Sequence, residues 1–172
     1  MTSEPTSQAA PTVAVAAFDL ALPRKRMAST VLLFDESDRV LVVEPTYVDF
    51  MELPGGSVDL DESPRQAAVR EIKEELGLDR QPGRLLAMDW VPPRPGRSEG
   101  IIAVFDGGRL TTEEIAGIRL PADELRSYAF LPAAEAARAL PDLLARRLRS
   151  CLNARAAATT VYLENGDRVA LS

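Results

Sequence analysis

Short apolar runs separated by turn-forming residues dominate the chain from Met27 onward, and they predict β-strands. Residues 29–34 and 40–43 flank a polar turn at 35–38 and therefore predict a β-hairpin. Near the end of the chain, Asn165-Gly166 lies between the apolar runs 160–163 and 168–171 and predicts a second hairpin. The other segments expected to be extended are Met51–Leu53, held before Pro54, and residues 85–91, 101–105 and 128–131.

A different spacing, with apolar residues three and four positions apart, predicts a helix that starts at Pro64. Ser63 is a favourable N-cap, Gln66 completes a capping box, and Gly77 is a favourable C-terminal stop. One side of this helix is predicted to be apolar and the other acidic: Ala68, Val69, Ile72 and Leu76 against Glu71, Glu74 and Glu75. Further helices are expected at residues 132–140 and 141–154.

Strands mixed with a few helices, without strict alternation, indicate an α+β layered sandwich. The length of 172 residues suits one domain with short appendages. We expect the domain at residues 26–156 and the terminal hairpin, 157–172, as an appendage. Residues 1–25 are expected to form a lead, disordered over the first 11 positions and then a strand or an arm.

The net charge of −6 argues against nucleic acid or an anionic membrane as the main binding partner. No stretch approaches the roughly 18 apolar residues that are needed to span a bilayer. The basic residues near the N-terminus follow an apolar run instead of preceding it, which is not typical of a signal peptide. We therefore expect a cytoplasmic protein.

Histidine is absent, which excludes the most common general base, the Ser–His triad and histidine-bound zinc. The single cysteine, Cys151, cannot form an intrachain disulfide, which fits a reducing compartment. Cys151 lies in a stretch with helical apolar spacing, where packing is expected in preference to a catalytic role.

Glu71, Glu74 and Glu75 occupy positions i, i+3 and i+4 of the predicted helix, so their carboxylates are expected to converge on one patch. Hard oxygen donors in such a cluster suit Mg²⁺ or Mn²⁺. Gly55 allows the backbone, and a carbonyl ligand, to approach the same place. Arg70 is placed to fix a carboxylate in one orientation. The alternative is an acidic helix face that is merely solvated.

The wider spacing favours the metal site. Gly56, Glu62 and the run Arg70-Glu71-Ile72-Lys73-Glu74-Glu75-Leu76-Gly77-Leu78 match every defined position of the Nudix box. The chain therefore resembles the Nudix hydrolase family, with a supporting pattern over roughly residues 27–140. One departure is Asp61, where family members often carry glycine; it affects the shape of the loop more than the activity.

The resemblance implies a Nudix-type α/β/α sandwich with a mixed sheet and the box as loop–helix–loop. It implies hydrolysis of the diphosphate bond in a nucleoside diphosphate linked to another moiety, with Mg²⁺ or Mn²⁺ as cofactor. It implies metal ligands at Glu71, Glu74, Glu75 and the Gly55 carbonyl, while Arg70 orients the glutamates and Glu62 supports them.

The base that takes the proton of the attacking water must be a carboxylate, because the chain has no histidine. The candidates are the box glutamates and the later pair Glu113 and Glu114. The segment that holds this pair equally predicts a short helix capped by Thr111 or Thr112.

Contacts with the rest of the substrate are less specific. Trp90 is expected either to stack on a base or to cap the core, with Arg97 available to hold a phosphate. Tyr47 is a further candidate for the same cleft. The arginine-rich residues 138–155 favour an amphipathic helix packed on the domain over an RNA-binding face. The terminal hairpin covers a sheet edge of this chain or of a neighbour, which leaves a homodimer open.

Two other functions compete with a metal-dependent diphosphate hydrolase. A non-catalytic nucleotide-binding regulatory module is disfavoured because the box keeps all of its glutamates. A prenyl diphosphate isomerase needs a cysteine in the cleft, whereas Cys151 lies late in a predicted helix. The box does not identify the substrate, so nucleoside triphosphates, dinucleoside polyphosphates, ADP-ribose and nucleotide sugars all stay open.

Overall fold

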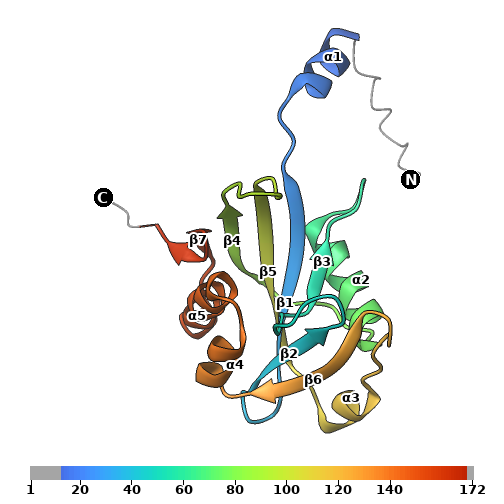
Figure 1. Ribbon diagram of the computed structural model, residues 1–172, viewed down its shortest axis with the longest axis vertical. Coiled ribbons are helices and arrows are strands. Elements are labelled where there is room, and N and C mark those ends of the chain that lie inside the picture. The colour runs from blue at the N-terminus through green and yellow to red at the C-terminus, as the bar shows by residue number, and fades with distance from the viewer. Residues whose placement is uncertain (1–12, 170–172) are drawn as a thin grey trace, which may run out of the picture.

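A computed structural model describes residues 13–169, in which the strands form one mixed sheet (Figure 1). The order is β6-β2-β1-β5-β4-β7-β8, and β3 pairs with residues 28–30 of β1. The pairs β1–β5 and β4–β7 are parallel, and the others are antiparallel. The strands are β1 (Arg26–Phe34), β2 (Val40–Pro45), β3 (Gly55–Ser57), β4 (Leu85–Val91), β5 (Gly100–Arg109), β6 (Leu125–Leu131), β7 (Val161–Glu164) and β8 (Asp167–Arg168).

Helices cover both faces of this sheet (Figure 1). Helix α2 (Pro64–Leu76) packs on one face, and α4 (Ala133–Ala139) and α5 (Asp142–Ala156) pack on the other. The short α3 (Thr112–Gly117) precedes β6. The predicted α+β sandwich is confirmed, because a mixed sheet lies between helical layers.

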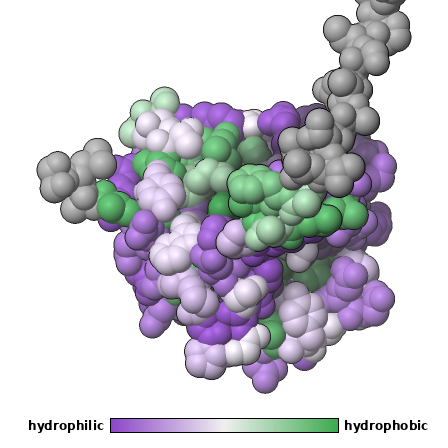
Figure 2. Space-filling view, turned by 90° about the horizontal axis from the view of Figure 1, so that it is seen from above, coloured by the Kyte–Doolittle hydropathy of each residue, from purple (hydrophilic) through white to green (hydrophobic). Residues whose placement is uncertain are grey.

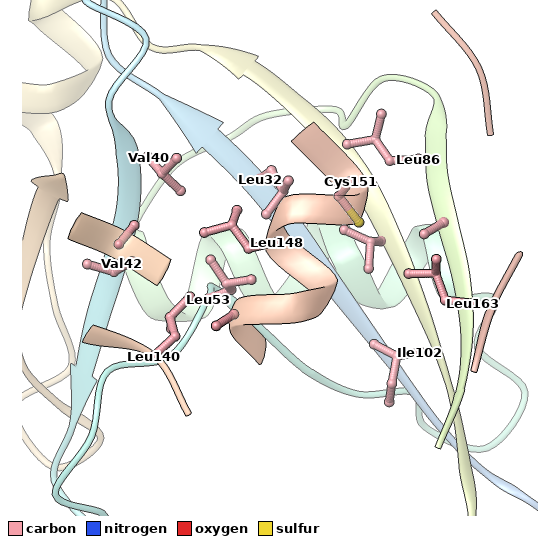
Figure 3. Packing of buried hydrophobic residues seen from close by; sticks show 14 of the residues in the cluster. Leu32, Val40, Val42, Leu53, Leu86, Ile102, Leu140, Leu148, Cys151 and Leu163 are labelled. Carbon is pink, nitrogen blue, oxygen red and sulfur yellow. The ribbon is translucent and has the colours of Figure 1, made fainter. Parts of the chain in front are cut away.

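The alternation of β1 shows how one strand serves two cores. Val31 and Leu33 belong to the cluster under α2, whereas Leu32 and Phe34 belong to the cluster under α5. All four side chains are at most 1% exposed. Figure 3 shows the second cluster, in which Leu148 and Cys151 of α5 point toward the sheet residues Leu32 and Leu86. Cys151 is therefore a packing residue, as its spacing predicted.

The N-terminal lead is partly different from the prediction. Residues 13–21 form a helix, α1 (Val13–Ala21), so the alternative of a strand is wrong. Figure 1 shows α1 held away from the sheet by the chain that leads into β1, which agrees with the alternative of an arm. Phe18, Leu20 and Leu22 are exposed, and Figure 2 shows an apolar surface beside the grey N-terminal residues. The disorder predicted for residues 1–11 lies outside the described residues.

The predicted C-terminal hairpin is present as β7 and β8, and it extends the main sheet through pairing of β7 with β4. Asn165 and Gly166 have φ angles of 54° and 84°, the left-handed pair that an Asn-Gly hairpin turn requires. The hairpin thus covers an edge of its own sheet. None of the described helices is long and apolar enough to cross a membrane.

Candidate active site

Helix α2 begins and ends at the residues predicted by local chemistry. Ser63 Oγ accepts a hydrogen bond from the Gln66 N–H at 3.2 Å, and the Gln66 side chain accepts one from the Ser63 N–H at 2.9 Å. Gly77 ends the helix with a φ of 71°. On the buried side the prediction needs one correction, because Ala67 is fully buried and Val69 only half-buried. The glutamates lie on the side that faces β3.

Gly55 and Gly56 lie directly against these glutamates. The Gly55 N–H donates a hydrogen bond to Glu75 Oε2 at 2.9 Å. A Cβ atom on Gly56 would overlap the Glu71 carboxylate. Gly55 has a φ of 138°, and a Cβ there would overlap the backbone of Ser29. Both positions need glycine, one for its backbone conformation and one for close approach of a carboxylate.

Arg70 joins the loop to the helix. Its Nε and Nη2 donate to the two oxygens of Glu62 at 2.9 and 2.8 Å, and Nη2 also donates to the Ser57 carbonyl at 2.9 Å. Its Nη1 donates to Glu71 Oε1 at 2.8 Å and to Glu74 Oε2 at 2.9 Å. The bidentate contact with Arg70 lowers the pKa of Glu62 to about 2. Glu62 and Arg70 therefore form the ion pair that orients the box carboxylates.

Arg70 occupies only one oxygen of Glu71 and one of Glu74. Within residues 13–169, no hydrogen bond involves Glu71 Oε2, Glu74 Oε1 or Glu75 Oε1. No three acidic side chains of the described residues are close enough to share a metal ion. The predicted convergence of the carboxylates is thus incomplete, because Glu71 and Glu74 meet at Arg70 Nη1, whereas Glu75 binds the Gly55 N–H.

The donor chemistry nevertheless fits a divalent cation. Burial raises the pKa of Glu75 to about 8, with further raising by the charges of Glu71, Glu52 and Glu124 and lowering by the Gly55 N–H. Burial also raises the pKa of Glu71. Half-buried carboxylates with solvent-accessible oxygens are what Mg²⁺ or Mn²⁺ stabilises. Glu71, Glu74 and Glu75 are the side chains that would hold such an ion.

A cavity of about 270 Å³ opens beside Gly55 and Gly56. Its walls come from β1, β3, residues 47–53, the loop before β5 and helix α5. Two predicted substrate-binding residues line it, Tyr47 and Arg97. Burial raises the pKa of Tyr47, and the charges of Glu52 and Glu75 raise it further. Tyr47 therefore lies near these two carboxylates.

Trp90, the third candidate, does not line this cavity. Its indole Nε1 donates to Glu99 Oε2 at 2.8 Å, and Glu99 also pairs with Lys25 at 2.6 Å. Strand alternation explains this position, because Asp89 contacts α5 and its neighbour Trp90 must point to the opposite face of β4. The structure therefore gives Trp90 no part in the cavity.

Glu113 and Glu114 lie on α3, as the short-helix alternative predicted. Glu114 accepts a hydrogen bond from the Thr111 N–H at 2.7 Å and pairs with Arg80 Nη1 at 2.5 Å. The contact with Thr111 and the pair with Arg80 lower the pKa of Glu114. Neither glutamate lines the cavity, so the structure does not bring this pair to the box.

Four residues that the sequence did not assign to the site face it in the structure: Arg26, Glu52, Glu124 and Arg147. The sequence contains a signal that Arg147 faces the domain. Arg147 lies three positions after Leu144 and next to Leu148, close to the apolar stripe of its helix. Glu124 had none, since it comes from a loop far away in sequence.

Comparison with known proteins identifies the family of this chain. A family model described as the NUDIX domain matches residues 24–152. The chain belongs to the Nudix family. The prediction from the box is thereby confirmed, and α2 with its flanking loops is the Nudix box of this chain.

Several proteins are similar to this Nudix chain. A Bacillus subtilis (strain 168) protein provisionally named 8-oxo-dGTP diphosphatase is 49% identical over 49 residues, which are 28% of this chain and 33% of that protein. Human diphosphoinositol polyphosphate phosphohydrolase 2 is 39% identical over 66 residues, 38% of this chain and 37% of that protein. The matched segment thus spans about a third of each relative's length.

The Nudix fold is also found among solved structures. The MutT protein from Methanosarcina mazei Go1 superimposes with a TM-score of 0.64 at 21% identity, covering 80% of this chain and 99% of that one. At this identity the likeness shows the fold alone. The site of this Nudix chain must therefore be argued from its own residues.

Proposed function

We propose that this Nudix protein is a metal-dependent hydrolase that cleaves the diphosphate bond of a nucleoside diphosphate linked to another moiety. The observation that carries the proposal is the position of the half-buried Glu71 and Glu75 against Gly55 and Gly56, two glycines that line a cavity. The names of relatives with matching segments, a diphosphatase and a phosphohydrolase, support the same reaction class.

Glu71, Glu74, Glu75 and the Gly55 carbonyl are the proposed metal ligands. Bound Mg²⁺ or Mn²⁺ supplies neutralisation of the diphosphate and lowers the pKa of a water molecule. Arg70 holds Glu71 and Glu74 in place and is itself fixed by Glu62. Glu74 is about half exposed, so it can turn from Arg70 toward an ion without disturbing the core.

The protein must also supply a proton acceptor for the attacking water. Glu52 lines the cavity, Glu75 lies against Gly55 in its wall, and burial raises the pKa of both carboxyl groups. A carboxylate with a raised pKa is a stronger base once it is ionised. We therefore favour an acid of the cavity over Glu113 or Glu114, which lie on α3.

The test is hydrolysis of a panel of nucleoside triphosphates, dinucleoside polyphosphates, ADP-ribose and nucleotide sugars with Mg²⁺ or Mn²⁺, with products identified by mass spectrometry. Glu74→Gln and Glu75→Gln are expected to lower kcat by about 100-fold or more, because each removes a charged ligand. Glu135→Gln, an exposed position on α4, is the matched control.

Turnover that survives both box substitutions would contradict the assignment of the site. Tight binding of a nucleotide without turnover by the unaltered protein would favour the regulatory module instead. Glu113→Gln is expected to retain activity, and a loss of activity in that variant would return the general base to α3. The homodimer and the cytoplasmic location stay predictions.

A further inference from the structure

The charged side chains that line the cavity are mainly basic. Four charged residues line it, and three of them are arginines: Arg26, Arg97 and Arg147, with Glu52 as the fourth. They come from three separate elements, the start of β1, the loop before β5 and helix α5. This concentration of positive charge stands out in a chain with a net charge of −6.

Arg147 is built into the floor of the cavity. Its side chain is only 5% exposed, and its Nε donates to Asp89 Oδ2 at 2.7 Å. Asp89 is fully buried, and its other oxygen accepts a hydrogen bond from the Gly166 N–H at 3.0 Å. Asp89 therefore fixes the position of the Arg147 guanidinium, and the Gly166 N–H in turn fixes Asp89.

The two terminal nitrogens of Arg147 have no hydrogen-bond partner among the described residues. No side-chain nitrogen or oxygen in residues 13–169 is both buried and unsatisfied. Nη1 and Nη2 of Arg147 must therefore be accessible to solvent. The open space that Arg147 borders is the cavity. A buried guanidinium with free donors in a cavity is a site for an acceptor on a ligand.

Arg26 and Arg97 form no salt bridge among the described residues, although Arg97 is near enough to the cavity carboxylate Glu52 to oppose the rise in its pKa that burial causes. Arg26 donates from Nε and Nη2 to the Ser98 carbonyl at 3.3 and 3.1 Å, which orients its guanidinium. Burial and the charges of Arg97 and Arg94 lower the pKa of Arg26, so these positive groups repel one another. An anion between them would relieve that repulsion.

Arg26 lies away from the box along β1, and its guanidinium is directed to the Ser98 carbonyl in the loop before β5. Thr30 of β1 pairs with Gly55, and Arg26 lies four residues earlier on the same strand. At about 3.3 Å per residue, this separation is roughly 13 Å. A diphosphate held at Glu71 and Glu75 contains two phosphorus atoms joined by a single oxygen, so it is too short to extend to Arg26.

We infer that the cavity binds a second oxyanion of the substrate, a phosphate or a carboxylate, that lies on the moiety beyond the cleaved diphosphate. Arg26 and Arg97 hold it at the rim, and Arg147 donates from the floor. The inference rests on the proposed function, because it extends the substrate class at that site. It favours polyanionic substrates over ADP-ribose or simple nucleotide sugars, whose distal moieties are uncharged.

The anion site is tested first without metal and without turnover. Calorimetry in EDTA compares AMP with adenosine, and ribose 5-phosphate with ribose. The phosphorylated member of each pair is expected to bind at least about tenfold more tightly, with a loss of that difference in Arg97→Gln and Arg26→Gln. Arg149→Gln, an exposed position on α5 outside the cavity lining, is the control and is expected to change binding less than about twofold.

Arg147→Lys keeps a positive charge beside Asp89 and so protects the fold, but it removes the forked donors. This variant is expected to bind AMP several-fold more weakly. Equal binding of AMP and adenosine, or a preference for AMP that survives Arg97→Gln, would overturn the inference.

NADPH and NADH test whether the anion site lies away from the diphosphate. The two molecules differ by one phosphate that is not part of the diphosphate. With Ca²⁺ in place of Mg²⁺, NADPH is expected to bind about tenfold more tightly, and Arg97→Gln should abolish the difference. Equal affinities would overturn the inference. Anion binding that persists in a protein without hydrolytic activity would contradict the proposed function alone, because the two tests have separate readouts.

Discussion

Glu75 illustrates, at the scale of one residue, how burial changes the protonation of a carboxyl group. Its pKa is raised from 4.5 to about 8 by burial, so the folded protein holds a proton there that the unfolded chain releases. A raised carboxyl pKa gives stability that is complete below the unfolded value and lost as pH rises through the folded value.

We therefore expect the metal-free protein to lose stability between about pH 5 and pH 8, by on the order of 2–4 kcal/mol from this group. Urea unfolding in EDTA at several pH values measures the effect. Glu75→Gln should flatten the profile, because glutamine does not titrate. An equally steep profile in that variant would show that other groups dominate.

Gly56 gives a second prediction at the residue scale. Its substitution by alanine places a Cβ against the Glu71 carboxylate, which Arg70 holds in position. We expect Gly56→Ala to lower kcat by about tenfold or more, since displacement of a ligand by about 1 Å has effects of this size. Gly117→Ala is the control, because a Cβ there meets open space and the backbone angle is ordinary. Comparable losses in both variants would exclude a specific contact.

At the scale of elements, α2 is defined by its ends. Ser63 supplies both the cap and the reciprocal bond with Gln66. Ser63→Ala is expected to cost about 1 kcal/mol of unfolding free energy. Ser98→Ala is the control in urea titrations, since only the backbone of Ser98 accepts the bonds from Arg26. A Ser63→Ala protein as stable as its parent would mean that tertiary packing alone ends the helix.

The elements that could be predicted from sequence are those with local causes. Ser63 and Gly77 delimit α2, and Asn165-Gly166 makes the terminal turn, because capping and positive φ depend on neighbouring residues alone. The strands β4 and β2 were found from their apolar runs. Residues 13–21 were ambiguous, since the apolar run there carries no cap or turn signal that separates a helix from a strand.

The site was predictable only where its residues share the box. Glu62, Arg70 and Glu71 are linked by spacing on one loop and helix. Glu124 and Arg147 reach the site through tertiary contacts between distant segments, and no periodicity encodes that meeting. The position of Trp90 outside the cavity lining has a related reason, because the run of β4 does not tell which face of the sheet a side chain occupies.

At the scale of the whole molecule, one buried ion pair ties three regions together. Asp89 of β4 binds Arg147 of α5 and the Gly166 N–H of the terminal hairpin. Removal of one partner leaves a buried charge without compensation, so Asp89→Ala should destabilise the protein by about 3–5 kcal/mol.

The double variant Asp89→Leu/Arg147→Met removes both charges and is expected to recover most of that stability. Chemical denaturation measures both proteins. A double variant no more stable than Asp89→Ala would show that the hydrogen bond to the hairpin, and not charge balance, is what matters.

The burial of Cys151 has a practical consequence. Desolvation raises the pKa of this thiol to about 12, so almost no thiolate exists at neutral pH. Because the chain has no second cysteine, alkylation by iodoacetamide should proceed only when α5 separates from the sheet. The rate of alkylation therefore reports how often α5 separates from the sheet, and mass spectrometry can follow it without knowledge of the substrate.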